Sequence, residues 1–237
     1  MAYAFGPGKI VEDGLVFYVD AANKDSYVSG SSDTFGLITP SLTGSLKNDT
    51  SFASSNAGIW EFDGSDEYID FGNLLTLKDA SVITWNLWVN FAAQSFNIVF
   101  GKGASPDVIQ FYTWSFGPGV GYFFLKTANV GTTAVINPFI GSLINLNEWN
   151  MFTIVFDGNE TGNDRLKIYL NGGSSNIITS YGGTPPATLP DTTDSFYISK
   201  GTNGTFDGEI SNFKMYNKVL SAQEVLQNYN ALKGRFI

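Results

Sequence analysis

The sequence predicts an all-β fold, and composition is the first observation that does so. The 237 residues include 26 Gly, 20 Phe and 11 Tyr, and only 15% are charged. Aromatic side chains favour strands, and glycine favours the turns that join them. With 43% hydrophobic residues, a chain of this length can bury one substantial core, and β-sandwiches often reach this size as one domain. We therefore expect a single domain of many short strands.

The second observation is a period of two in the hydrophobic pattern, which is typical of strands. In residues 81–91, the large apolar side chains fall on one side of the predicted strand, which we expect to face the core: Ile83, Trp85, Leu87, Val89 and Phe91. The opposite side carries Thr84, Asn86, Trp88 and Asn90. Residues 165–170 alternate in the same way and place Leu166, Ile168 and Leu170 inward.

The chain predicts roughly a dozen strands between polar or glycine-rich turns. Residues 26–57 are rich in Ser, Thr, Gly and Asn, so we expect irregular loops with one or two short strands there. Residues 58–72 predict a hairpin around Asp63–Asp66, and a second hairpin is predicted around the turn at 117–121. The strands outside the first hairpin are predicted at 14–21, 81–91, 97–103, 108–116, 121–128, 149–158, 165–173, 195–201 and 208–217.

The two ends of the chain differ from this strand pattern. Residues 1–13 contain Gly6, Pro7 and Gly8 with little periodicity, so we interpret them as an N-terminal arm before a domain at 14–237. Ser221 is followed three residues later by Glu224, which is the capping-box signature of a helix start. We expect a short helix over about 221–233, which Gly234 ends.

Composition also excludes several classes of function. The chain has no Cys and no His, which removes thiol nucleophiles, imidazole bases and the usual zinc sites. Its net charge of -9 opposes nucleic-acid binding, which depends on basic surfaces. No apolar stretch is long enough to cross a bilayer, and the first residues lack the apolar region of a signal peptide. We expect no nucleic acid and no membrane among its partners.

The order of several segments resembles a known family. The segments are GLVFYVDAAN near the start, FDGSDEYIDFG, ITWNLWV, NEWNMFTIVFDG, RLKIYLNGG, and FYISKG leading into TFDGEISNFKMYNKVLSAQEV. Together they span about Gly14 to Ala231, and the last is the most specific. The chain resembles the laminin G-like, concanavalin A-like jelly-roll domains. The resemblance implies two antiparallel sheets that pack face to face around one core, followed here by the short helix.

The same family includes sugar-binding, adhesion and display domains, so fold alone leaves the function open. GLVFYVDAANKDSY and LSAQEVLQNYNALKGRF are similar to laminin G-like structural proteins of tailed, especially marine, bacteriophages. This similarity implies a virion structural protein, made in the host cytoplasm and displayed on the capsid or a fibre. We expect it to dock on other virion proteins through the arm at 1–13 and to form a homo-oligomer.

We expect no enzymatic activity. Related glycoside hydrolases carry Glu-x-Asp-x-x-Glu along one strand, and this chain has no such triplet. Glu67 and Asp70 are three residues apart, so in a strand they point to opposite faces, whereas a retaining pair must share one side. Carboxylates can still converge from distant strands. We interpret Glu209, in the strand expected to close the sheet, as a solvated or loop-tethering residue.

The acidic side chains fit calcium binding better than catalysis, because the hard oxygen ligands that calcium prefers gather readily at loop rims. Some relatives hold structural calcium in this way. The candidate ligands are Asp20, Asp63, Asp66 and Glu209. No spacing in the sequence selects among them, and Ser211 stands where relatives often carry an acidic residue.

Aromatic side chains are the candidates for a glycan site, because a ring offers an apolar surface to the C–H side of a sugar. Alternation places Tyr112 and Trp114 on one face of a strand, and we expect Trp88 and Tyr122 to join that sheet. The alternative is that these rings fill the core or contact another protomer. The second functional hypothesis is therefore a lectin-like module that recognises host surface polysaccharide.

Overall fold

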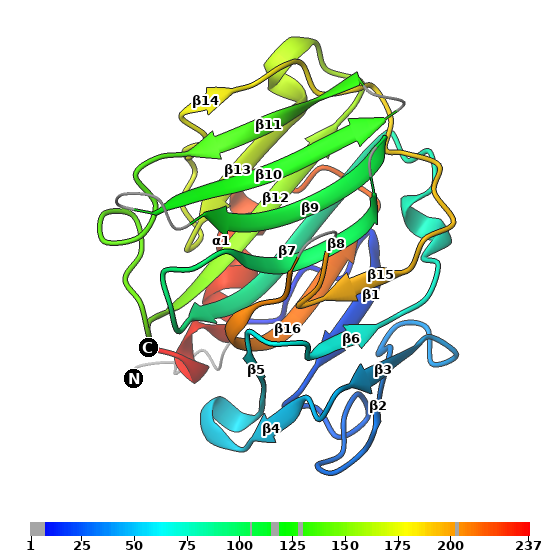
Figure 1. The fold of residues 1–237 in the computed structure, drawn as a ribbon, viewed down its shortest axis with the longest axis vertical. Coiled ribbons are helices and arrows are strands. Elements are labelled where there is room, and N and C mark those ends of the chain that lie inside the picture. Colours follow the sequence, from blue (N-terminus) through cyan, green and yellow to red (C-terminus); the bar gives the residue numbers. More distant parts are fainter. Residues whose placement is uncertain (1–7, 105, 115–118, 128–129, 202–203) are drawn as a thin grey trace, which may run out of the picture.

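The computed structural model describes residues 8–104, 106–114, 119–127, 130–201 and 204–237; for Trp114 and Val130 the description covers the backbone alone. Figure 1 shows two large sheets, one behind the other, with the single α-helix behind the rear sheet. All strand pairs within the two sheets are antiparallel. The expected all-β, two-sheet sandwich with a short C-terminal helix is confirmed.

Sheet A is the rear sheet of Figure 1 and contains seven strands. Their order across the sheet is β13 (Leu166–Leu170), β12 (Trp149–Asp157), β7 (Val82–Phe91), β16 (Asp207–Tyr216), β5 (Ile59–Asp63) and β4 (Ser51–Ala53). The seventh strand, β1 (Leu15–Asp20), pairs with the second half of β16, from Asn212 to Tyr216. The long strands β7 and β16 therefore form the middle of the sheet.

Sheet B contains nine strands and lies in front in Figure 1. The first five in order are β14 (Ser180–Tyr181), β11 (Val130–Ile136), β10 (Val120–Thr127), β9 (Asp107–Trp114) and β8 (Asn97–Ala104). The other four are β15 (Phe196–Ile198), β6 (Tyr68–Asp70), β3 (Thr43–Lys47) and β2 (Asp33–Phe35). Short 3-10 turns lie at η1 (Ser55–Ala57), η2 (Leu75–Leu77), η3 (Gly162–Arg165) and η4 (Lys233–Arg235).

The sequence placed most strands correctly but missed some pairings. The pair β9–β10 forms as expected, although residues 115–118 of the predicted turn lie outside the described residues. The prediction of a hairpin at 58–72 is wrong, because β5 joins sheet A whereas β6 joins sheet B. The chain crosses from one sheet to the other through the turn between them. Strand β11 was not predicted, and residues 26–57 hold three short strands instead of one or two.

Aromatic side chains fill the space between the sheets. The predicted inward set of β7 is fully buried, which confirms the alternation there: Ile83, Trp85, Leu87, Val89 and Phe91. Phe100 of sheet B packs edge-on against Phe213 of sheet A, with ring centroids 5.1 Å apart. Trp85 lies 5.4 Å from Phe123 across the same interface. Burying a ring of this size contributes roughly 1.5–3 kcal/mol, so these contacts hold the two layers together.

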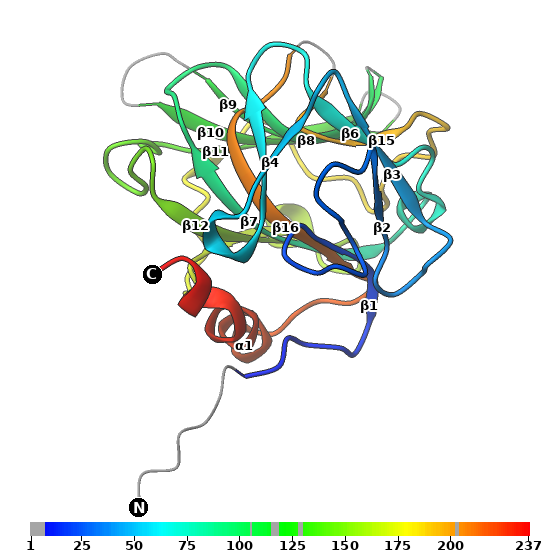
Figure 2. The ribbon, with the colours of Figure 1, turned by 90° about the horizontal axis from the view of Figure 1, so that it is seen from below.

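The helix α1 (Ala222–Leu232) begins as the sequence predicts. The amide of Glu224 donates to Ser221 Oγ, and the carboxylate of Glu224 accepts from the amide of Ser221, which completes the capping box. Figure 2 shows α1 against the side of sheet A that faces away from sheet B. Its buried residues are Val225, Asn228 and Ala231. The helix therefore covers the outer face of sheet A.

The residues just before β1 contact the same helix. The amide of Val11 donates to Asn228 Oδ1 at 2.8 Å, and Gln227 Nε2 donates to the carbonyl of Lys9 at 2.9 Å. Val11 is buried in a small apolar cluster with Val225. Residues 1–7 of the predicted arm lie outside the described residues. The described start of the chain and its C-terminal helix thus lie together on one face of the sandwich.

The end of the chain is fixed by a buried ion pair. Arg235 Nη1 donates to both carboxylate oxygens of Asp20, at 3.1 and 3.0 Å, and Nη2 donates to Ser211 Oγ and to the carbonyl of Gly58. Phe236 then stacks on Trp88 of β7 with ring centroids 4.4 Å apart. The last residues therefore pack on the outer face of sheet A as a continuation of α1.

Beneath this cover lies a buried lysine. Lys214 of β16 is completely inaccessible, donates to Asn86 Oδ1 at 3.4 Å and to Asn212 Oδ1, and lies 5.1 Å from the centre of the Tyr18 ring. Burial lowers the pKa of Lys214 from 10.5 to about 7, partly opposed by Asp20. Charged groups in apolar surroundings are costly unless they are paired, and no carboxylate in the described residues contacts this ammonium directly.

We expect Arg235→Met to destabilise the protein by about 3 kcal/mol, because Asp20 would stay buried without its cationic partner. The matched control is Lys78→Met, which removes an exposed ion pair to Asp191 and should cost less than about 1 kcal/mol. Urea unfolding monitored by tryptophan fluorescence measures both. Equal losses in the two variants would contradict the structural role of the buried pair.

We expect the free energy of unfolding to rise with pH between about 7 and 9, partly because of Lys214. In that range the unfolded lysine keeps its proton while the folded lysine has lost it, so the unfolded state binds more protons and stability increases with pH, by at most about 1.4 kcal/mol per pH unit. Lys214→Met should remove this part of the slope and raise stability at pH 7. The exposed Lys24 provides the control variant, Lys24→Met. A slope that Lys214→Met leaves unchanged would contradict the assignment.

Candidate functional site

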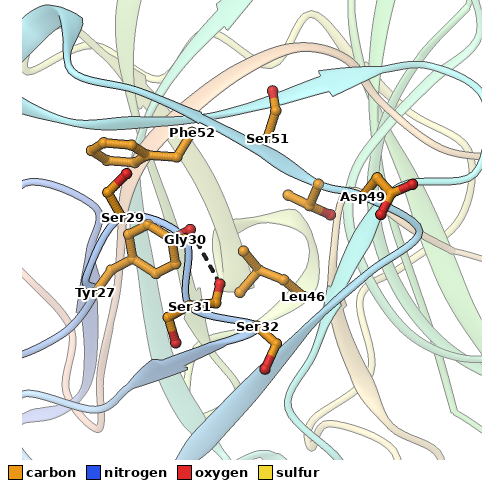
Figure 3. Close-up of a pocket in the computed structure, with 10 residues that line it drawn as sticks. Tyr27, Ser29, Gly30, Ser31, Ser32, Leu46, Asp49, Ser51 and Phe52 are labelled. Atoms are coloured by element: carbon orange, nitrogen blue, oxygen red, sulfur yellow. Dashed lines mark hydrogen bonds between the residues drawn. The ribbon is translucent and has the colours of Figure 1, made fainter.

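An open cavity lies between the loop that follows β1 and the strands β3 and β4. Its volume is about 450 Å3. We call it the serine cavity; its lining residues are Tyr27, Ser29, Gly30, Ser31, Ser32, Leu46, Asp49, Thr50, Ser51 and Phe52. Figure 3 shows the hydroxyl side chains arranged around the Tyr27 and Phe52 rings. The cavity thus combines an apolar floor with a polar rim.

The turn between β3 and β4 shapes one wall of the cavity. Asn48 and Asp49 have φ angles of 56° and 62°, a conformation that Asn and Asp tolerate better than most residues. Asn48 Nδ2 donates to the carbonyl of Asp66 at 2.8 Å, and Thr50 Oγ1 donates to the carbonyl of Lys47 at 2.8 Å. These bonds hold the turn in place, so the wall is built before any ligand arrives.

The floor of the cavity is anchored to the core. Tyr27 is 4% exposed, and its ring lies 5.2 Å from that of Phe52 and 5.9 Å from that of Trp60. The Tyr27 hydroxyl donates to the carbonyl of Ser31 at 3.2 Å, and burial raises the pKa of this phenol. The half-buried Phe52 remains partly open to solvent. The floor therefore offers a rigid apolar surface, which comes mainly from Phe52 because Tyr27 is almost completely buried.

The rim of the cavity supplies polar groups. Ser32 Oγ donates to Asp33 and Ser51 Oγ donates to Glu61, so both hydroxyls are already oriented by carboxylates. Ser29 is exposed, and within the described residues its hydroxyl makes no hydrogen bond. A small number of fixed polar groups around an apolar surface is the usual composition of a ligand site.

The aromatic residues singled out in the sequence lie on another part of the molecule. Tyr112 of β9 and Tyr122 of β10 are directly opposite each other in sheet B, and their rings stack 5.0 Å apart with an interplanar angle of 19°. Burial, and then Tyr122, raises the pKa of Tyr112. The stack covers one face of each ring, and Phe96 packs against Tyr112 with ring centroids 5.6 Å apart. The backbone of Trp114 belongs to β9, and its side chain lies outside the described residues.

The expectation that Trp88 joins the sheet of Tyr112 is wrong. Trp88 is in β7 of sheet A and is completely buried between Tyr229 of α1 and Phe236. Alternation correctly placed its ring on the side of β7 opposite to the core. What the sequence did not reveal is that the C-terminal segment covers that side, which leaves no ring surface for a sugar.

The four candidate calcium ligands do not gather at one point. Both carboxylate oxygens of Asp20 accept hydrogen bonds from Arg235, so they are already used within the protein. Asp63 and Asp66 lie in the exposed turn between β5 and β6, where the amide of Ser65 donates to Asp63 and lowers its pKa. Among the described residues no three acidic side chains form a group that could hold a metal ion. Calcium binding by this turn stays a prediction.

Glu209 has an acidic neighbour that sequence reasoning missed. It lies directly opposite Glu61 across the pair β16–β5, and both line an opening of about 200 Å3 on the outer face of sheet A. Asn90 Nδ2 donates to Glu209 and Ser51 Oγ donates to Glu61, each at 2.9 Å. The two glutamates are 148 positions apart in the chain, so no local motif could have found the pair.

The serine cavity was also missed by sequence reasoning. Its residues fall in 26–57, where the sequence predicts irregular surface loops with one or two short strands. The available signal was the concentration of serines around Tyr27 and Phe52, because hydroxyls near aromatic residues are the pairing that a sugar site uses.

Comparison with known proteins gives the family and the fold. Residues 63–226 match the family described as the concanavalin A-like lectin/glucanases superfamily, Laminin_G_3. No curated protein matches the chain in sequence. The α-helix in the described part of the chain is too short to span a membrane.

Solved structures share the fold at low sequence identity. A sialidase of Trypanosoma rangeli in complex with 2,3-difluoro-KDN is 12% identical with a TM-score of 0.63, over 100% of this chain and 36% of the sialidase chain. This chain therefore spans about a third of that enzyme. Domain 4 of AbnA, a GH43 extracellular arabinanase from Geobacillus stearothermophilus, in complex with arabinotriose, is 15% identical with a TM-score of 0.62, over 92% of this chain and 100% of that domain. Identities at this level show the fold alone.

Proposed function

The chain belongs to the concanavalin A-like lectin/glucanases superfamily, and from this premise we propose that it is a non-enzymatic domain that binds carbohydrate in the serine cavity. The observation that carries the proposal is the composition of that cavity. Apolar rings form its floor, and serine hydroxyls with the Asp49 carboxylate form its rim. A sugar has the matching surface, with C–H groups on one side and hydroxyls around its edge.

The size and rigidity of the cavity support the same proposal. A volume of about 450 Å3 lies within the range of about 300–1,000 Å3 that ligand sites occupy. The floor is held by the core and the wall by the hydrogen-bonded turn at Asn48–Asp49. Preorganised sites spend little free energy on ordering when a ligand binds. A neighbour of the same fold, the arabinanase domain, was solved with arabinotriose.

A binding role accounts for the arrangement better than a catalytic one. The sequence contains no His and no Cys, so paired carboxylates, which glycoside hydrolases use, are the first groups to consider for an acid–base mechanism. The pair Glu61–Glu209 is the nearest approach to a hydrolase site, but its opening of about 200 Å3 is smaller than most ligand sites. We therefore assign these glutamates no catalytic step.

We expect Phe52→Ala to weaken glycan binding about tenfold or more, because it removes the open part of the apolar floor. The probes are arabinotriose and an array of bacterial polysaccharides, with hits measured by calorimetry. Phe35→Ala is the matched control, because Phe35 is an exposed phenylalanine that does not line the cavity. Unchanged unfolding temperatures show that both variants are folded.

Three results would overturn the proposal. They are the absence of any binding on the array, an equal loss of affinity in the two phenylalanine variants, and the release of shorter sugars from a bound polysaccharide. If release occurred, Glu209→Gln would identify its source, and loss of the products in that variant would make the chain a hydrolase.

We propose display on a tailed-phage particle as the second candidate function. Its support is the sequence similarity to phage structural proteins, together with one feature of the structure. Lys9 and Val11 contact Gln227 and Asn228 of α1, so both ends of the described chain lie on the outer face of sheet A. Attachment at this face would leave the outer face of sheet B, on the other side of the sandwich, free. A homo-oligomer on a particle would strengthen weak glycan binding through multiple contacts.

We expect removal of residues 1–7 to abolish attachment to phage particles while preserving the fold, because the buried contacts of Val11 remain. Co-sedimentation of the tagged protein with particles of the phage that encodes it, followed by immunoblotting, measures attachment. The control is Gln227→Ala, which weakens only the bond to Lys9. Attachment of the shortened chain at the wild-type level would contradict a docking arm.

A further inference from the structure

A second cavity lies next to the serine cavity, on the other side of the β3–β4 turn. It has a volume of about 320 Å3, and we call it the lysine pocket; its lining residues are Asn48, Ser65, Asp66, Tyr68, Lys200, Gly201, Gly204 and Thr205. Asn48 lines the lysine pocket, while the next residue, Asp49, lines the serine cavity. The two cavities therefore share one turn, and a single extended ligand can reach both.

The ammonium group of Lys200 is held by aromatic rings. Lys200 Nζ lies 3.7 Å from the centre of the Tyr68 ring and 5.1 Å from the centre of the Tyr197 ring. The two rings meet edge to face, with centroids 5.5 Å apart and an interplanar angle of 87°. An ammonium is attracted to the negative face of such a ring. The side chain of Lys200 is thus positioned without help from a carboxylate.

A ring positions a cation but does not neutralise it, because the ring carries no net charge. Among the described residues Lys200 forms no ion pair, since the four ion pairs there involve Lys78, Lys218 and Arg235. Its ammonium also makes no hydrogen bond to the described part of the chain. The Asp66 carboxylate also lines the pocket but forms no ion pair with Lys200, whose ammonium is the one cation among the described lining residues. This ammonium can accept an anionic group.

The backbone around Lys200 is fixed. Lys200 pairs with Thr205 in an isolated bridge, and Ser199 before it has a φ angle of 68°. Thr205 Oγ1 donates to the carbonyl of Ser65 across the pocket at 3.1 Å. A side chain at Gly201 would place its Cβ 2.8 Å from Ile98, so the chain packs closely at this point. The ammonium is therefore presented from a rigid frame.

We propose that the lysine pocket binds a carboxylated sugar, a residue of the uronic acid class, within an oligosaccharide that also occupies the serine cavity. The carboxylate of the sugar pairs with Lys200, and the sugar hydroxyls meet Asn48, Ser65 and the Asp66 carboxylate at the rim. This inference rests on the proposed carbohydrate-binding function and adds a ligand class to it. A neutral neighbouring sugar lies on the Tyr27–Phe52 floor.

The test compares two forms of one probe, oligogalacturonides of equal length with free or methyl-esterified carboxyl groups. Esterification removes the charge and keeps the sugar backbone. We expect the free acid to bind about tenfold more tightly than the ester, because a charge-assisted hydrogen bond is lost on esterification. The preference should shrink as salt concentration rises, because salt screens exposed charges.

Lys200→Gln should abolish the preference for the free acid and leave the affinity for the ester unchanged, whereas Lys24→Gln should alter neither. Phe52→Ala should weaken both forms equally. The inference is overturned if the wild-type protein binds acid and ester equally, if Lys200→Gln keeps the preference, or if neither form binds while another glycan binds in the serine cavity. In each of these cases, the proposed function stands if Phe52→Ala weakens the binding of whichever glycan the wild-type protein binds.

Discussion

The packing of aromatic rings between the two sheets is the interaction on which the rest of the structure depends. Phe100, Phe123 and Phe213, with Trp85, form contacts that cross from one sheet to the other. The apolar area that these rings remove from water holds the layers together in a chain with no disulfide. Both cavities lie at the edge of this core and take their rigidity from it: Trp60 supports Tyr27, and Ile98 packs closely against Gly201.

The C-terminal segment buries much of the outer face of sheet A, in addition to the inner face that the core buries. The C-terminal segment covers Trp88 with Phe236 and brings Arg235 to Asp20. Several polar residues of this face are consequently hydrogen-bonded to one another instead of to water, and Lys214 is the extreme case. A buried polar layer of this kind contributes less to stability than an apolar layer. However, removing one hydrogen-bond partner within it lowers the free energy of unfolding, because the other partner stays buried and unpaired. The C-terminal segment therefore occupies much of this face, and the serine cavity and the lysine pocket lie elsewhere.

The two cavities show how an acidic protein of this family can offer different chemistry to a ligand. The serine cavity provides hydroxyls and rings, and the lysine pocket provides one cation held by Tyr68 and Tyr197. They meet at the turn Asn48–Asp49, whose positive φ angles allow consecutive side chains to face different cavities. A short turn thus links the two cavities.

The sequence alone determined the local features. Alternating side chains identified β7 and β13, and Ser221 with Glu224 identified the start of α1, because each depends on neighbours a few residues away. Only the tertiary structure decided which sheet each strand joins, as the separation of β5 from β6 shows. It also decided that Trp88 is covered, that Glu61 faces Glu209, and that the serines of 26–57 surround an aromatic floor. These arrangements arise from contacts between residues far apart in the chain, whose pairing is set by the packing of the whole core and leaves no pattern in any short stretch.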